Sequence, residues 1–247
     1  MNKIRLSAVA GGVSAAMLFG WSQPGYSQQE TYECLMEPAV QLALSSSVAG
    51  IIQSIEVDRG SKVKKGQKLV RLDATTELAT IKLAKAKLEF GQRKVARAEE
   101  LFREKFTSEY SVDEAVTETR LAEVELAQAR TLFGLKTLTS PISGIVVERL
   151  AQVGEFVSDD EILKLAQLDP LHIEVILPLE QLNSISEGME ATVYPGAPVG
   201  GEYKATVETV DQVLDAASGT FGVRLILPNP DSLLPAGLRC RVKFPQN

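Results

Sequence analysis

The hydrophobic positions of the chain change their period twice along its length. Residues 48–73 alternate short apolar runs with glycine turns, and a period of two is typical of β-strands. Residues 75–135 instead repeat every seven positions, and from residue 169 onward the period of two returns. The pattern therefore predicts a mainly β protein that is interrupted by one helical insertion.

The helical insertion is predicted to be an antiparallel pair of helices. Large residues recur at the first heptad position and small ones at the fourth, which allows two helices to pack closely. These positions are Ile81, Leu88, Val95 and Phe102 with Ala84, Gly91 and Ala98, then Val112, Thr119, Leu126 and Phe133 with Ala115, Ala122 and Ala129. Helices of about 25–30 residues extend roughly 40 Å. The alternative is an ordinary helix bundle, but the sequence offers no third helical pattern to complete one.

The β-regions on the two sides of this insertion are copies of each other. Four glycines carry the match and are predicted to mark turns: Gly50 corresponds to Gly144, and Gly60 to Gly154 at the same offset. Val63 and Leu69 recur in the same way as Val157 and Leu163. A split β-repeat around a helical rod indicates an elongated spacer rather than a reaction chamber.

Short β-runs separated by turn residues follow from Asp169 to the end of the chain. They are His172–Leu177, 191–194, 203–210, 221–227 and 238–244. In the last run Cys240 and Val242 alternate with Arg239 and Arg241, which places the cysteine on the inward face. Five or six strands of this kind predict a small closed β-barrel.

The first 27 residues have the composition of an export signal. Lys3 and Arg5 precede an apolar stretch from Leu6 to Trp21, and the small residues around Ser27 suit a cleavage site. An uncleaved membrane anchor is the alternative, although sixteen residues fall short of the roughly 20 that a spanning helix needs. We expect a cleavable signal peptide and a periplasmic protein.

The charge balance argues against a nucleic-acid partner. Residues 1–27 hold two of the 26 basic residues and none of the 32 acidic ones, so the remaining chain carries 24 positive against 32 negative charges. A nucleic-acid-binding face would need clustered basic residues for the phosphates.

The two cysteines, Cys34 and Cys240, lie near opposite ends of the predicted mature chain. An even pair in an exported protein favours a disulfide. Two buried free thiols are the alternative, because free cysteine is among the most buried residue types.

The sequence contains no recognisable active site, so we expect no enzyme activity, no cofactor and no metal centre. The single histidine, His172, alternates with apolar residues in a predicted strand, where a structural role is the simplest explanation. One histidine and two cysteines are a poor zinc ligand set, and no phosphate-binding glycine loop is present. The acidic cluster at 159–161 fits a solvated turn.

Residues 50–73 resemble the first half of a lipoyl or biotinyl domain, and residues from Ser140-Pro141-Ile142-Ser143-Gly144 onward resemble the second half. In carrier proteins of this kind the two halves meet at a turn that presents the modified lysine. Here residues 74–138 take the place of that turn, so the resemblance implies that the carrier function has been lost.

A split lipoyl-like β-sandwich with an inserted coiled coil, followed by a β-barrel, resembles the periplasmic adaptor or membrane fusion protein family (HlyD-like). The segments 216–224 and 234–238, together with Asn229-Pro230, resemble the barrel signature of that family. The organisation we predict is a signal peptide at 1–27, an N-terminal arm at 28–47, lipoyl halves at 48–73 and 139–168, a coiled-coil hairpin at 74–138 and a β-barrel at 169–247. Cys34 and Cys240 would then join the arm to the last barrel strand.

The resemblance also implies partners and a docking site. Family members link an inner-membrane pump to an outer-membrane TolC-type channel and assemble as rings, which the resemblance implies to be hexamers. Arg97, Leu101 and Ser108 fit the spacing that the family uses at the hairpin tip to dock onto the channel. Arg97 and Leu101 are one helical turn apart, so both can face the same partner; an ordinary solvated arginine and a seam-flanking leucine are the alternative.

The function implied by this resemblance is a periplasmic adaptor of a tripartite efflux system, with a pump of the resistance-nodulation-division (RND) class in the interpretation we favour. An adaptor for an ABC-driven type I secretion system is the first alternative, and a lipoyl or biotinyl carrier the second. The transported substrate has no signature in the sequence.

Overall fold

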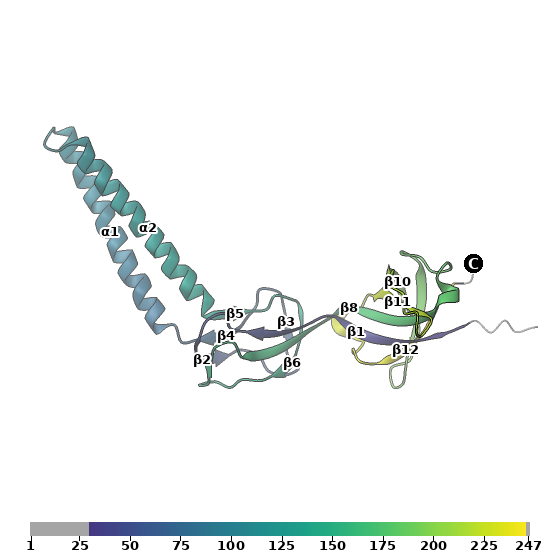
Figure 1. The fold of residues 1–247 in the computed structure, drawn as a ribbon. Helices are drawn as coiled ribbons and strands as arrows, with labels where there is room; N and C mark the ends of the chain where they lie inside the picture. Colours follow the sequence, from purple (N-terminus) through teal and green to yellow (C-terminus); the bar gives the residue numbers. More distant parts are fainter. Residues whose placement is uncertain (1–29, 246–247) are drawn as a thin grey trace, which may run out of the picture. The chain divides into compact units, whose positions relative to one another are not determined.

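The computed structural model describes residues 30–245, and in this part of the chain it consists of β-strands and one pair of long helices (Figure 1). The predicted signal peptide, residues 1–27, lies outside the described residues, as do the first two residues of the predicted arm. No helix among residues 30–245 is both long enough and apolar enough to cross a membrane. The predicted mainly β fold with a helical pair is confirmed.

Six strands form a closed barrel. Their order is β1-β12-β9-β10-β11-β8, and a further pairing of β1 with β8 closes the ring. The bounds are β1 Tyr32–Ser45, β8 Glu161–Pro178, β9 Glu190–Pro195, β10 Tyr203–Val210, β11 Thr220–Leu227 and β12 Arg239–Lys243, with short 3-10 turns at Leu179–Gln181 and Pro230–Ser232. The closed barrel expected from the alternating pattern is therefore present.

The barrel core comes from the inward residues of each strand. On β8 the side chains of Ile173, Val175 and Leu177 are fully buried, whereas the alternate positions face outward. β12 repeats this alternation, with Cys240 and Val242 buried between exposed Arg239 and Arg241. The period of two in the sequence thus identified the core face correctly.

Strand β8 is much longer than the run predicted for it. The sequence analysis began this strand at His172, yet β8 starts at Glu161 and continues through Pro170. Pro170 is tolerated because the register of β1 and β8 shifts between Pro38 and Val40, and no pairing uses residues 168–170. A proline lacks the backbone N–H that a regular ladder needs, so it fits where the ladder is already interrupted.

A second sheet and the outer part of the first form the module that carries the internal repeat. The four-stranded sheet has the order β5-β4-β2-β7, and β6 and β3 extend the large sheet beyond β8. The bounds are β2 Gly50–Ile55, β3 Lys62–Val63, β4 Lys68–Leu72, β5 Thr137–Thr139, β6 Gly144–Arg149 and β7 Phe156–Val157. A separate apolar core between them includes Leu69, Leu163 and Leu165.

The two copies of the repeat pair with each other in a reciprocal way. Gly50 of the first copy lies opposite Val157 of the second, and Val63 of the first lies opposite Gly144 of the second. The turn prediction is wrong for Gly50 and Gly144, which are the first residues of strands; at Gly144 a Cβ would meet the Ala166 carbonyl. Gly60 and Gly154 do lie in turns, with φ of 84° and 89°. These last two turns require glycine because L-residues rarely adopt such positive φ values.

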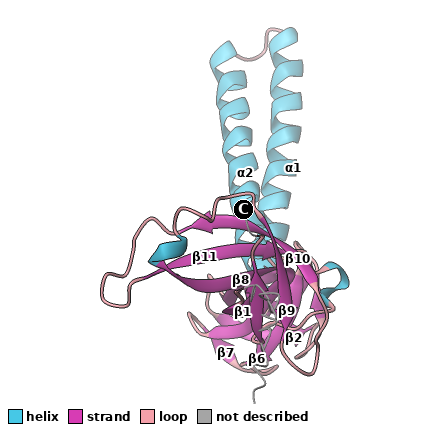
Figure 2. Cartoon of the chain, turned by 90° about the vertical axis from the view of Figure 1, so that its right-hand side faces the viewer, coloured by secondary structure: helices cyan, strands magenta, loops and turns pink. Residues whose placement is uncertain are grey.

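The helices α1 (Thr75–Arg103) and α2 (Glu109–Leu135) lie side by side along their length and are joined by a short loop (Figure 2). They are antiparallel, because Lys87 pairs with Glu125 while Lys94 pairs with Glu118. All their buried residues are heptad positions named from the sequence: Ala84, Gly91, Ala115, Thr119, Leu126 and Ala129. Phe102 was expected to continue this seam but is 44% exposed, because α1 ends one residue later.

Lys136, the residue that follows α2, links the base of the helix pair to the module that carries the internal repeat. Its Nζ lies 3.2 Å from a carboxylate oxygen of Glu77 in α1 and donates a hydrogen bond to the carbonyl of Ala49. Asp73, just before α1, accepts hydrogen bonds from the backbone N–H and the hydroxyl of Thr75. These two bonds lower the pKa of Asp73, with a smaller contribution from the charge of Lys136.

Candidate docking site

The loop that joins the two helices is shaped by a helix-terminating motif. The backbone N–H of Phe106 donates to the carbonyl of Leu101, and that of Lys105 donates to the carbonyl of Phe102, both at 2.9 Å. Lys105 adopts a left-handed conformation with φ of 66°. This is a Schellman motif with lysine at the position that usually holds glycine, and it satisfies carbonyls left unpaired at the end of α1.

Ser108 begins the second helix. Its Oγ accepts a hydrogen bond from the backbone N–H of Ser111 at 3.3 Å and lies 3.2 Å from the Ser111 hydroxyl. Serine is a preferred N-cap because its side chain satisfies a free N–H of the first turn. The structure therefore assigns Ser108 a capping role that the sequence analysis did not identify, and its docking role stays a prediction.

Arg97 and Leu101 are both exposed on α1, one turn apart, as the sequence analysis expected. The backbone carbonyl of Leu101 accepts the hydrogen bond from the N–H of Phe106 in the loop. Among residues 30–245, no ion pair or side-chain hydrogen bond holds the Arg97 guanidinium. Whether these residues meet a partner stays a prediction.

The sequence analysis missed the exposure of three aromatic residues in the same region, one of which, Phe102, it had assigned to the seam. Phe102, Phe106 and Tyr110 lie within nine residues, and the last two are 77% and 75% exposed. With Leu101 they form what we call the tip cluster. The available signal was compositional, since three aromatics gather here in a chain with only 6% aromatic residues. Exposed apolar clusters of this kind mark interaction sites, because water is a poor environment for them.

A second apolar patch lies on the repeat module. Ile51 and Phe156 face each other across β2 and β7, and Val153 lies in the adjoining turn; all three are exposed. At the equivalent pairing of the other half, Ile145 faces Lys62. β7 and its counterpart β3 are both edge strands of their sheets. The β7 edge carries large apolar residues in solvent, the reverse of what solvent exposure alone favours.

The other residues that the sequence analysis singled out, the two cysteines and the histidine, lie in strands of the barrel. Cys34 and Cys240 are directly opposite in β1 and β12 and form a disulfide inside the barrel wall. His172 is mostly buried on β8, with its Nε2 3.8 Å from a carboxylate oxygen of Glu208. Within residues 30–245 no group of three or more His, Cys, Asp or Glu side chains is arranged to hold a metal ion.

Two family models match almost all of the described chain. Residues 41–167 match a CzcB-like barrel-sandwich hybrid domain, and residues 170–247 match a CusB-like β-barrel domain. Both descriptions name β-structural domains and neither names an enzyme.

Curated relatives include periplasmic linkers of efflux pumps. The chain is 28% identical over 207 residues to the solvent efflux pump periplasmic linker SrpA of Pseudomonas putida, covering 77% of this chain and 54% of that protein. It is 26% identical over 226 residues to the multidrug export protein AcrE of Escherichia coli, covering 80% of this chain and 59% of that protein. The chain thus spans a little over half the length of these relatives.

Solved structures share the fold. A MacA–MexA chimeric protein containing the α-hairpin domain of Pseudomonas aeruginosa MexA superposes with a TM-score of 0.75 at 22% identity, covering 87% of this chain and 78% of that one. The membrane fusion protein Spr0693 of Streptococcus pneumoniae superposes with a TM-score of 0.72 at 14% identity, covering 88% and 99%.

Proposed function

The chain belongs to the periplasmic adaptor, or membrane fusion protein, family, and from this premise we propose that it is the adaptor subunit of a tripartite efflux system. In this proposal it links an inner-membrane transporter of the RND class to an outer-membrane TolC-type channel. The protein acts in the periplasm after removal of residues 1–27. It contributes binding surfaces and a section of a sealed conduit, and performs no chemical reaction.

The observation that carries the proposal is the tip cluster at the end of a two-helix insertion. Leu101, Phe102, Phe106 and Tyr110 are large apolar side chains left in solvent where the helices end. Burying such a side chain contributes about 1.5–3 kcal/mol, so several of them together can anchor a partner despite the cost of association. Arg97, one turn from Leu101, adds a charged group whose guanidinium can bind carboxylates or carbonyls.

The domain organisation expected from the sequence completes the proposal. Residues 48–73 and 139–168 form the two halves of a lipoyl-like sandwich, residues 74–138 form the inserted coiled coil, and residues 169–247 form the barrel together with β1 of the N-terminal arm. Copies assemble as a ring in which these modules lie side by side. The apolar patch at Ile51, Val153 and Phe156 supports such an assembly, because a neighbouring module would cover it.

A carrier function has little support from the site itself. The lysine nearest to the place where a carrier would present its modified residue is Lys136. Its side chain is largely buried, pairs with Glu77 and donates to the Ala49 carbonyl. An amine held in this way is poorly accessible to a modifying enzyme.

The test is export by the protein carrying Leu101→Asp together with Phe106→Asp, expressed in the native host lacking its own copy. We expect export of the compounds that the wild type removes to be lost, with circular dichroism and protein level unchanged. Val124→Asp is the matched control, since the exposure of Val124 on α2, 61%, lies between those of Leu101 and Phe106, and the residue lies away from the tip. Export at the wild-type level by the doubly substituted protein would refute the proposal.

A further inference from the structure

Strand β8 belongs to both β-modules and changes its neighbour between them. Residues 163–166 pair with β6 of the repeat module, and residues 171–178 pair with β11 of the barrel. Residues 168–170, between these two stretches, have no ladder partner in β1, β6 or β11. They also coincide with the boundary between the two family models, one of which ends at residue 167 while the other begins at residue 170. We call residues 168–170 the joint.

A loop of the barrel binds the joint through one buried side chain. Asn229 follows β11 by two residues, and its side chain is among the few buried polar ones. Its Nδ2 donates to the carbonyl of Leu168 at 2.8 Å and to that of Leu234 at 2.9 Å, and its Oδ1 accepts from the N–H of Leu234. The backbone N–H of Asn229 donates to Oδ1 of Asp169 at 3.0 Å. Asn229 therefore satisfies the Leu168 carbonyl, which no neighbouring strand pairs.

The same loop is also held from the repeat module. Nζ of Lys62, in β3, donates to the carbonyl of Asp231 at 3.0 Å. Asp231 and Ser232 both lie in the left-handed region, with φ of 62° and 55°. Residues other than glycine adopt this region at a cost and keep it where surrounding contacts hold them. We call residues 229–234 the clamp loop, because its contacts reach both the joint and the repeat module.

The covalent connection between the two modules consists of two strands. The chain passes from the barrel to the repeat module in β1 and returns in β8. The pairing of these strands is interrupted at the joint, where three residues of β8 lie opposite Ala39 alone. A two-stranded ribbon is only marginally stable by itself, and an interrupted ladder bends more easily than a regular one. The joint is therefore the point at which one module would turn against the other.

We propose that the clamp loop is a strap that fixes the setting of the barrel against the repeat module, with Asn229 as its positioning residue and Lys62 as its second anchor. This gives a role to the asparagine of the Asn229-Pro230 pair, which the sequence analysis placed in the barrel signature. In an adaptor whose ends bind different partners, a fixed joint presents both binding surfaces together. That last step rests on the proposed function, whereas the fixed joint does not.

The test measures the distance between two spin labels on the purified full-length protein. The labels are attached through Asp159→Cys in the repeat module and Glu202→Cys in the barrel, both exposed positions. The native cysteines are joined to each other and leave no free thiol in the described chain. We expect one narrow distance distribution with the clamp intact. Asn229→Ala should roughly double its width, and Lys62→Met should broaden it in the same direction, because the joint then relies more on its two strands.

Matched controls separate positioning from stability. Ser140→Ala removes a similarly buried side-chain hydrogen bond, the one to the carbonyl of Ile142, within the repeat module. Lys64→Met removes a nearby exposed lysine whose side chain makes no ion pair or hydrogen bond in the described part of the chain. Both should leave the distribution unchanged. A label pair within the barrel, Glu33→Cys with Glu202→Cys, should respond to none of the four substitutions.

An unchanged distribution in Asn229→Ala and Lys62→Met, with circular dichroism like that of the wild type, would overturn the inference. A wild-type distribution as broad as that of Asn229→Ala would overturn it as well. If Asn229→Ala fails to fold, Lys62→Met decides alone, because it changes only an exposed side chain. Export by the unlabelled variants should fall at unchanged protein level. Normal export by a variant with a broadened distribution would overturn the functional step and leave the proposed function standing.

Discussion

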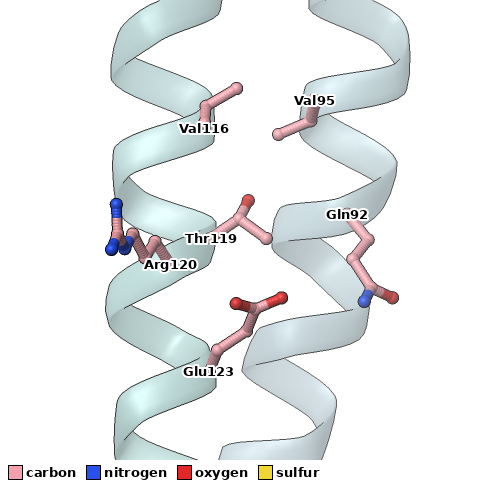
Figure 3. Close-up of a pocket in the computed structure, with 6 residues that line it drawn as sticks. All are labelled: Gln92, Val95, Val116, Thr119, Arg120 and Glu123. Atoms are coloured by element: carbon pink, nitrogen blue, oxygen red, sulfur yellow. The ribbon is translucent and has the colours of Figure 1, made fainter.

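Gly91 is buried where α1 packs against Thr119 of α2 (Figure 3), and its replacement by alanine tests how the pair is held together. A Cβ atom at this position would lie 2.7 Å from Oγ1 of Thr119 and 3.2 Å from its Cα. The hydroxyl of Thr119 is also engaged, since it donates to the Ala115 carbonyl at 2.8 Å. The added methyl group therefore meets a side chain that moves only by losing a hydrogen bond.

Two opposing effects set the change in stability that Gly91→Ala should cause. Alanine gains about 1 kcal/mol over glycine in a helix interior. Overpacking of a well-packed site costs typically about 1–3 kcal/mol, and displacing the Thr119 hydroxyl adds about 1 kcal/mol for its hydrogen bond. We expect Gly91→Ala to destabilise the helix pair by roughly 1–3 kcal/mol.

Gly134→Ala is the matched control, because no atom lies within 4 Å of the Cβ position at that helical glycine. It should stabilise α2 by up to about 1 kcal/mol. Urea unfolding followed by far-ultraviolet circular dichroism reports on the pair, since α1 and α2 are the only long helices among residues 30–245. Adding Thr119→Ala to Gly91→Ala should restore part of the loss, which a double-mutant cycle measures. Equal stabilisation by the two glycine replacements would refute the reasoning.

Three further predictions concern the contacts that hold the modules. Lys136→Met should destabilise the protein by roughly 1–3 kcal/mol, measured by thermal unfolding, because it leaves the carboxylate of Glu77, only 22% exposed, without its cation. Replacing both Cys34 and Cys240 with alanine should cost on the order of 4–5 kcal/mol, since the crosslink closes a loop of 206 residues; unchanged denaturant stability would contradict this. Asp73 has a lowered pKa when folded, so its stabilising contribution is present above pH 3.8 and lost as pH falls below it. Asp73→Asn should therefore reduce stability at neutral pH and have little effect in strong acid, as unfolding curves at several pH values would show.

Local periodicity made much of the fold predictable. The heptad spacing identified Ala84, Gly91 and Leu126 as seam residues, because a helix face is defined by neighbours three and four positions apart. The alternation around Cys240 identified the inward face of β12 for a similar reason. Such assignments depend only on residues close in sequence, so no knowledge of the tertiary structure was needed.

Features that depend on pairing between distant residues were not predictable. Strand β8 continues through Pro170 because β1 shifts its register there, which the sequence of β8 alone does not reveal. The left-handed conformation of Lys105 was also missed, because glycine is the usual residue in that position.

The candidate site was predictable only in part. Arg97 and Leu101 were placed on one exposed helix face from their spacing, and Ser108 was placed at the turn. The exposure of Phe106 and Tyr110 could not be read from the heptad pattern, because both lie outside the seam positions and follow the end of α1. Their contribution to docking stays a proposal with its own experiment.

The central claim is that the tip of the helix pair binds an outer-membrane channel. The most direct measurement is crosslinking in living cells from a photoreactive amino acid introduced at Phe106 of the full-length protein, with the captured product identified by mass spectrometry. Arg93, exposed on the outer face of α1 and away from the tip, serves as the control position. The account predicts that position 106 captures a TolC-type channel protein and position 93 does not. Capture of the inner-membrane transporter at position 106, or of no protein in cells that export normally, would contradict it.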